Sequence, residues 1–259
     1  MTSPEPRPRI CLATAGGPHP WILARSLAET FEITIVREAP ESTRAFLRRR
    51  ARMSGWLSTA GQFMTMVVIR FGKRLFRKRV ERHLAEAGAS ADFPQELRLV
   101  DVPSVNSDAF LDAVRTIQPD AVLLVGCRML KPRYLERLEA PVLNYHAGIT
   151  PAYRGMNGGY WARLNGDVQN YGSTVHLVDP GVDTGRVVRH QRLAPRADDT
   201  IMTDAYRIAA ASSTACREAL EIVLEGGPLP AVPAPERSRQ WFHPPIWTYL
   251  WHGVTRRVW

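Results

Sequence analysis

Short apolar runs alternate with helix-type patterns along most of this chain, and this alternation constrains the fold more than any other feature. The runs that predict strands are 9–13, 31–36, 97–102, 121–125, 142–145, 173–178 and 187–190. Helical spacing is present around 18–27, 107–117 and 132–138, and a capping signal at 198–200 predicts one long helix over 201–224. Such alternation predicts an α/β fold with a doubly wound, mostly parallel sheet.

The length of the chain, 259 residues with 45% apolar content, suits one main domain. We expect this domain to span residues 1–226, interrupted by a helical insertion at 42–83 and followed by a Pro- and Trp-rich extension at 227–259. The polar, proline-rich start of the chain does not resemble a secretory signal, so we expect a cytoplasmic protein.

Positive charge is concentrated in the insertion. The whole chain carries a net charge of +9, yet residues 42–82 hold twelve Lys or Arg and one acid, Glu81, which leaves the rest of the chain slightly acidic. We therefore do not expect nucleic acid to be the partner of the main domain. The basic, apolar-rich insertion fits contact with a membrane surface, an anionic acceptor or a partner protein, and equally a helix pair packed on the sheet edge with a solvated arginine face. Packing is likewise our first expectation for the aromatic tail around Trp247 and Trp251, with membrane contact or dimerisation as its alternatives.

Three cysteines, Cys11, Cys127 and Cys216, are too scattered for a disulfide framework. None has a Cys or His at metal-ligand spacing, so we expect no metal site.

Candidate site residues lie where a predicted strand ends. Asn144 and His146 are two residues apart, so their side chains leave the same face of the strand. Alone, such a pair is more typical of capping or hydrogen bonding. Asp183 lies in a loop rich in Gly and Pro, and this loop would fold over the same end of the sheet if strand 173–178 lies next to the strand of Asn144.

At these positions the sequence resembles the formyltransferase family, which includes glycinamide ribonucleotide, methionyl-tRNA and sugar-nucleotide formyltransferases. The resemblance extends over about residues 10–226. The matching motifs are Asn144-x-His146, Pro151-x-Tyr153-Arg154-Gly155, Trp161-Ala162 with Asn165-Gly166-Asp167, Gly172-x-Thr174-Val-His176 and Asp183-x-Gly185.

The resemblance implies a Rossmann-like formyltransferase fold and an enzyme that moves a formyl group from the co-substrate 10-formyltetrahydrofolate to an amine. The acceptor would be a small molecule, such as an amino sugar, a compound like glycinamide ribonucleotide or a specialised metabolite. By resemblance, Asn144 would hold the formyl oxygen, His146 would stabilise its negative charge, and Asp183 would keep His146 charged and accept or relay the amine's proton. His176 is either a structural residue or one that orients Asp183.

The resemblance also implies a pterin pocket. We expect it to be formed by Arg128, Met129, Leu130, Asp179, Gly181 and Val182. Met129 and Leu130 could instead be core residues.

Departures from the family pattern concern the acceptor. Ala147-Gly-Ile-Thr-Pro151 replaces the Ser-Leu-Leu-Pro of many relatives, and the first loop, 15–19, lacks the phosphate-binding residues of glycinamide ribonucleotide enzymes. The chain shows no counterpart of the C-terminal barrel of methionyl-tRNA enzymes or the N-terminal domain of deformylases, so both roles lose weight. Two alternatives remain open: a hydrolase of the same folate, and a non-catalytic basic module that binds a membrane or nucleic acid.

Overall fold

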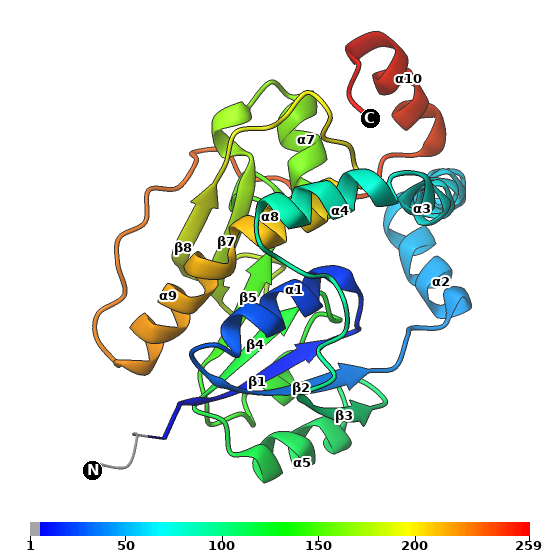
Figure 1. Ribbon diagram of the computed structural model, residues 1–259. Helices are drawn as coiled ribbons and strands as arrows, with labels where there is room; N and C mark the ends of the chain where they lie inside the picture. The colour runs from blue at the N-terminus through cyan, green and yellow to red at the C-terminus, as the bar shows by residue number, and fades with distance from the viewer. Residues whose placement is uncertain (1–5) are drawn as a thin grey trace.

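A seven-stranded sheet forms the centre of the computed structural model, which describes residues 6–259 (Figure 1). The strand order is β3-β2-β1-β4-β5-β7-β8. The strands are β1 Arg9–Thr14, β2 Glu32–Glu38, β3 Arg98–Val102, β4 Ala121–Val125, β5 Val142–His146, β7 Gly172–Leu177 and β8 Val187–Arg192. All pairs from β3 through β5 are parallel, whereas β7 is antiparallel to both β5 and β8. The predicted α/β fold with a mostly parallel sheet is confirmed.

Helices cover both faces of this sheet because the strands bury side chains on both faces. Along β1, Ile10 and Leu12 point into one apolar core, and Cys11 and Ala13 point into the other. The first core also receives residues from α1 Pro18–Leu27, α8 Asp204–Ala211 and α9 Ser213–Leu224. The second receives residues from α5 Asp108–Ile117 and α6 Pro132–Leu135.

The single helix predicted over 201–224 is wrong, because the structure has two helices, α8 and α9, with a break at Ser212. The Ser212 hydroxyl donates to the carbonyl oxygen of Ile208 and lies 2.6 Å from the hydroxyl of Ser173 in β7. Asp199, part of the predicted capping signal at 198–200, instead forms a buried ion pair with Arg207. Polar side chains with tertiary partners therefore set the helix boundaries here.

The basic insertion contains three helices: α2 Thr43–Ser54, α3 Trp56–Leu75 and α4 Arg77–Glu86. Ser42 caps α2 by accepting a hydrogen bond from the Ala45 N–H. Val80 and Leu84 of α4 enter the first core, whereas α2 and α3 contribute no residue to it. The insertion is thus integrated with the body at its C-terminal end.

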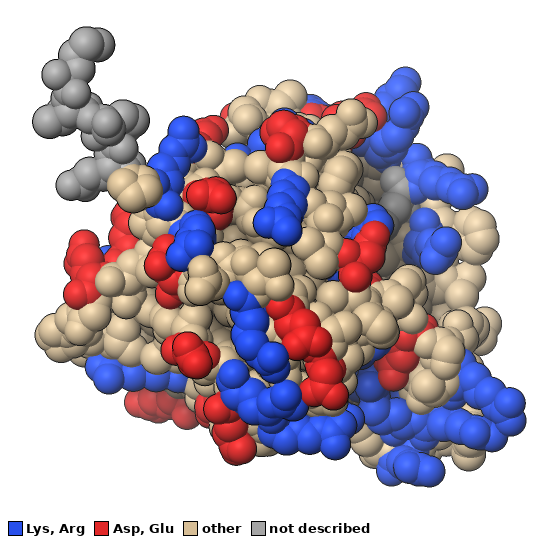
Figure 2. All heavy atoms as spheres, turned by 90° about the horizontal axis from the view of Figure 1, so that it is seen from below, with Lys and Arg blue, Asp and Glu red and all other residues tan. Residues whose placement is uncertain are grey.

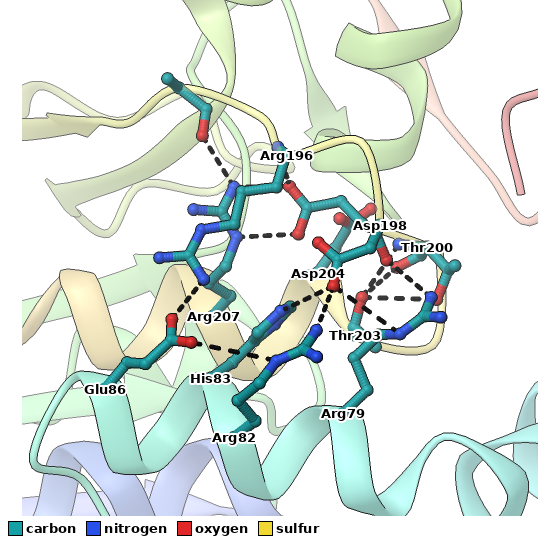
Figure 3. Close-up of polar contacts among 12 residues, drawn as sticks. Arg79, Arg82, His83, Glu86, Arg196, Asp198, Thr200, Thr203, Asp204 and Arg207 are labelled. Carbon is teal, nitrogen blue, oxygen red and sulfur yellow. Dashed lines mark hydrogen bonds and ion pairs between the residues drawn. The ribbon is translucent and has the colours of Figure 1, made fainter.

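Charged groups fix α4 to the body (Figure 3). Asp198 accepts a hydrogen bond from Arg82 and lies 3.4 Å from Nε2 of the buried His83. Arg196 pairs with Glu86 at 2.5 Å. These contacts tie α4 to the segment that precedes α8.

The C-terminal tail packs on the body through a two-stranded sheet, in which β9 Gln240–Trp241 pairs with β6 Arg154–Gly155. The Trp241 indole donates to the carbonyl oxygen of Ala152 and stacks on Trp161 of α7 Gly158–Leu164, with 4.5 Å between ring centroids. A 3-10 turn, η1 Val168–Asn170, follows α7. The last helix, α10 Ile246–Arg256, contacts α3 (Figure 1). Within residues 6–259, no helix is both long and apolar enough to cross a bilayer.

Candidate active site

Strands β5 and β7 bring the predicted catalytic side chains together. Asn144 pairs in register with His176. The Asn144 side-chain amide donates to Oδ1 of Asp183 at 3.2 Å, and Nδ1 of His146 lies 3.5 Å from Oδ2 of the same carboxylate. The structure therefore places Asn144, His146 and Asp183 in one cluster.

The loop that carries Asp183 reaches this cluster by turning back across the sheet. Because β7 is antiparallel to β5, the loop leaves β7 beside the start of β5, where the Val178 N–H bonds to the Val142 carbonyl oxygen. A side chain at Gly185 would lie 1.7 Å from the Leu177 carbonyl oxygen, so glycine is required for this close return. Asp183 itself has a positive φ of 51°. Asp tolerates this region better than most residues, and such backbone strain is typical of functional sites.

Backbone contacts hold the carboxylate in place. The Gly155 N–H donates to Oδ2 of Asp183 at 2.8 Å, and the Arg154 guanidinium donates to the Val182 carbonyl oxygen at 3.1 Å. Burial alone would raise the pKa of Asp183, but the charge of His146 and the hydrogen bond from the Gly155 N–H lower that pKa to about 2. The carboxylate is therefore ionised at neutral pH.

The two histidines use their ring nitrogens differently. Nδ1 of His176 lies 2.7 Å from the Leu177 carbonyl oxygen and carries a proton, because a carbonyl can only accept. Its Nε2, 3.1 Å from the Asn144 amide, can then accept a hydrogen bond. Nε2 of His146 lies 2.6 Å from the Tyr153 carbonyl oxygen and carries a proton for the same reason. A doubly protonated His146 would thus donate to Tyr153 and toward Asp183.

A cavity of about 670 Å³ contains this cluster. Its lining includes all of the predicted pterin residues: Arg128, Met129, Leu130, Asp179, Gly181 and Val182. Their side chains differ in exposure: Leu130 is buried, whereas Met129 is half exposed. The Arg128 guanidinium lies 3.4 Å from the buried Glu38 carboxylate, which also accepts a hydrogen bond from the Arg128 N–H.

The cavity wall also includes residues that the sequence interpretation did not single out. Phe46, Arg49 and Arg50 come from α2 of the insertion, and Gln240 and Phe242 come from the tail. The sequence shows three consecutive arginines at 48–50, but it does not show which of them points into the cavity. Among residues 6–259, no group of three or more His, Cys, Asp or Glu is arranged to hold a metal ion.

Sequence comparison finds similarity to methionyl-tRNA formyltransferases. Methionyl-tRNA formyltransferase from Burkholderia orbicola is 32% identical over 166 residues, which cover 63% of this chain and 50% of that protein. The chain thus spans about half the length of the curated relatives it matches.

Solved structures share the fold at low sequence identity. A phosphoribosylglycinamide formyltransferase from Streptococcus pneumoniae matches with a TM-score of 0.53 and 20% identity, covering 83% of this chain and 98% of that chain. A sugar N-formyltransferase from a Shewanella species matches with a TM-score of 0.55 and 12% identity, covering 90% and 76%. The family model described as formyl transferase matches residues 73–220, which include β5, β7 and the whole Asp183 loop. The chain therefore belongs to the formyl transferase family.

Proposed function

We propose that this protein transfers a formyl group from 10-formyltetrahydrofolate to an amine of a small-molecule acceptor. The observation that carries the proposal is the contact of Asn144 and His146 with one buried, ionised carboxylate, Asp183, inside a cavity of about 670 Å³. Family membership and the curated relatives support a formyl donor.

In the proposed reaction, the neutral amine attacks the formyl carbon. The carbonyl oxygen becomes an oxyanion that accepts hydrogen bonds from Asn144 and His146. The amine nitrogen then loses a proton, N10 of the folate gains one, and the C–N10 bond breaks to release tetrahydrofolate. Donor binding requires an amide hydrogen of Asn144 and the Nε2–H of His146 to leave their present partners, His176 and the Tyr153 carbonyl oxygen.

The role of Asp183 follows from its acidity. A protonated amine has a pKa of roughly 8 or above, so lasting proton transfer to a carboxylate whose pKa is about 2 is strongly uphill. We infer that Asp183 stays ionised beside His146 and guides the amine's proton toward N10 of the folate without keeping it. His176 contacts both Asp183 and Asn144 and so acts as a positioning residue.

The donor would bind along the loops after β4 and β7, at the predicted pterin residues. We further propose that residues 1–226 form the catalytic unit and that the extension at 227–259 completes its cavity, because Gln240 and Phe242 belong to the wall.

The first experiment is calorimetric binding of a non-reactive 10-formyltetrahydrofolate analogue to the wild-type protein and to Asp183→Asn. Binding in the micromolar range by both supports the donor site. No binding to the folded wild-type protein would contradict the proposal. Formate release from 10-formyltetrahydrofolate without any amine would instead favour the hydrolase.

A second function, contact with a membrane surface, is favoured by the reversed polarity of α3. This helix buries Thr59, Gln62 and Thr65 beside one large apolar residue, Ile69, whereas Phe71 and Leu75 on its outer face are 59% and 86% exposed. A helix on a globular protein normally does the opposite.

Helix α10 extends this outer face beside α3. We define the α3–α10 apolar surface by its exposed large apolar residues: Trp56, Leu57, Met64, Val67, Val68, Phe71, Leu75, Trp247, Leu250, Trp251 and Val254. Trp247 lies over Gly61, where an added Cβ would come within 2.5 Å of its ring. Trp251 is 66% exposed, which differs from the packed tail expected from the sequence. Tryptophans at the edge of an apolar face are typical of membrane-interface segments.

Charge decides between an anionic membrane and a second copy of the chain. Helices α2, α3 and α10 contain no acidic residue, and exposed arginines such as Arg52, Arg70 and Arg74 lie on α2 and α3. In Figure 2, Lys and Arg gather along the right-hand side of the molecule, the side on which Figure 1 places α2 and α3. Two copies would bring like charges together, whereas anionic lipid headgroups would neutralise them. We therefore propose that the α3–α10 apolar surface rests on an anionic bilayer.

Flotation with vesicles of phosphatidylglycerol and phosphatidylcholine tests this second function. Wild-type protein should float with the vesicles, less so at high salt. Phe71→Glu with Leu75→Glu should remain in solution. Val168→Glu, an exposed apolar site outside this surface, is the matched control and should still float. Vesicle-independent dimers by ultracentrifugation, lost in the double variant, would favour a second copy instead.

A further inference from the structure

Arg50 is a buried cation in the wall of the cavity that holds the candidate site. It is 9% exposed, and its Nε donates to Oε1 of Gln62 at 2.7 Å. Its guanidinium lies 3.9 Å from the ring centroid of Phe242, and one amino group contacts the sulfur of Met156 at 4.0 Å. Arg50 therefore joins the insertion, the tail and the segment after β6 at one point.

Neighbouring arginines of the same cavity have acidic partners, and Arg50 does not. Arg49 donates with both terminal nitrogens to the Glu41 carboxylate, and Arg128 pairs with Glu38. Among the described residues, no carboxylate lies within ion-pair distance of Arg50. Its contacts with Gln62 and Phe242 leave its charge uncompensated.

A buried guanidinium without a counterion is costly to maintain. Burial, and then the nearby charge of Arg49, lower the pKa of Arg50 below its usual range. An anion in the cavity would compensate both effects. Arginine suits carboxylate and phosphate groups because its planar fork can donate two parallel hydrogen bonds.

We propose that Arg50 binds a carboxylate or phosphate group of the amine acceptor and so selects an anionic acceptor. This inference rests on the proposed formyl transfer and deepens it. Arg50 comes from α2 and lies against Met156 and Phe242, whereas the proposed donor residues come from the loops after β4 and β7. The anion therefore belongs to the acceptor, and the glutamate of the folate is the competing source.

The test uses three protein variants and two probes. The variants are Arg50→Met, Arg50→Lys and the matched control Arg48→Met, which removes an exposed arginine from the same helix. The probes are inorganic pyrophosphate and the non-reactive folate analogue, each titrated by calorimetry into the purified full chain.

We expect Arg50→Met to weaken pyrophosphate binding by at least about tenfold, with the folate affinity unchanged. Arg48→Met should leave both affinities unchanged, and Arg50→Lys should recover part of the pyrophosphate affinity. Unchanged folate binding also shows that Arg50→Met is folded.

Two outcomes would overturn the assignment. If Arg50→Met weakens the folate analogue and leaves pyrophosphate binding intact, the anion is the donor's glutamate. If pyrophosphate does not bind the wild-type protein, or binds Arg50→Met equally well, Arg50 holds no anion. Failure of the formyl-transfer proposal gives a different result, namely a wild-type protein that does not bind the folate analogue at all.

Discussion

Strand β1 and helix α3 are both rich in apolar residues, but β1 buries its apolar side chains and α3 exposes most of its own. Every residue from Ile10 to Ala13 is fully buried, and successive side chains enter opposite cores. Helix α3 buries hydroxyl and amide groups together with Ile69, whereas its Leu75 is 86% exposed. Apolar content alone therefore does not indicate burial. The strand is buried in the interior of the protein, whereas we attribute the outer face of α3 to the proposed membrane contact.

The site within the sheet should respond most strongly to mutation. We expect Asp183→Asn to lower formyl transfer by about 10²- to 10⁴-fold, because the cluster loses the negative charge that faces Asn144 and His146. Single-turnover kinetics with saturating donor measure the effect. Full activity in a folded variant that binds folate would remove Asp183 from the mechanism.

The same carboxylate should give acid sensitivity. Its pKa in the folded protein, about 2, lies below the ordinary value of 3.8, so its ionised form stabilises the fold above pH 3.8. This contribution, about 2 kcal/mol, should be lost as pH falls from about 4 toward 2. Urea unfolding at several pH values measures the loss. Asp183→Asn should show a shallower decline over this range.

A pair of leucine substitutions compares the two regions directly. Leu123→Ala in β4, at a fully buried position, should lower the free energy of unfolding by about 2–5 kcal/mol. Leu75→Ala in α3 should change it by no more than about 0.5 kcal/mol. Vesicle flotation should show the reverse order, with only Leu75→Ala weakened. Equal stability losses would show that α3 is packed in solution.

Gly61→Ala should separate α10 from α3. The added methyl group would lie 2.5 Å from the Trp247 ring, and such overpacking costs about 1–3 kcal/mol. Limited proteolysis should then cut near the start of α10 faster than in the wild-type protein. Ala60→Ser, at the neighbouring exposed position, serves as the control. An unchanged cleavage rate would indicate that α10 tolerates the methyl group.

The smallest effect is expected at the charged contacts of α4. Asp198→Asn removes the carboxylate that faces Arg82 and His83, and should cost about 1 kcal/mol because the pair is partly exposed. Glu81→Gln, in a largely exposed pair with Arg77, should have almost no effect. Thermal unfolding of both variants, with and without high salt, compares them. A larger loss for Glu81→Gln would contradict this account.

Local patterns predicted the strands of the sheet well. The strand runs identified in the sequence agree with β1 to β5, β7 and β8 to within a few residues, because alternation and burial leave direct signals. The break at Ser212 was not predictable, since it depends on a hydroxyl in a distant strand. The predicted site residues share one cavity, yet Arg50 was missed because its inward direction depends on Gln62 and Phe242. Long-range contacts of this kind produce no periodic pattern in the sequence.

The short sheet formed by β6 and β9 has a practical consequence. Gly155 donates its N–H to Asp183 on one side, and on the other its strand is paired with Gln240–Trp241. A Cβ at Gly155 would lie 2.3 Å from the Trp241 carbonyl oxygen, so the two strands leave no room for a side chain at this position. Anyone who shortens this protein before residue 240 would remove the strand that supports a carboxylate far earlier in the chain. Trimming the C-terminus is therefore an alteration of the candidate active site.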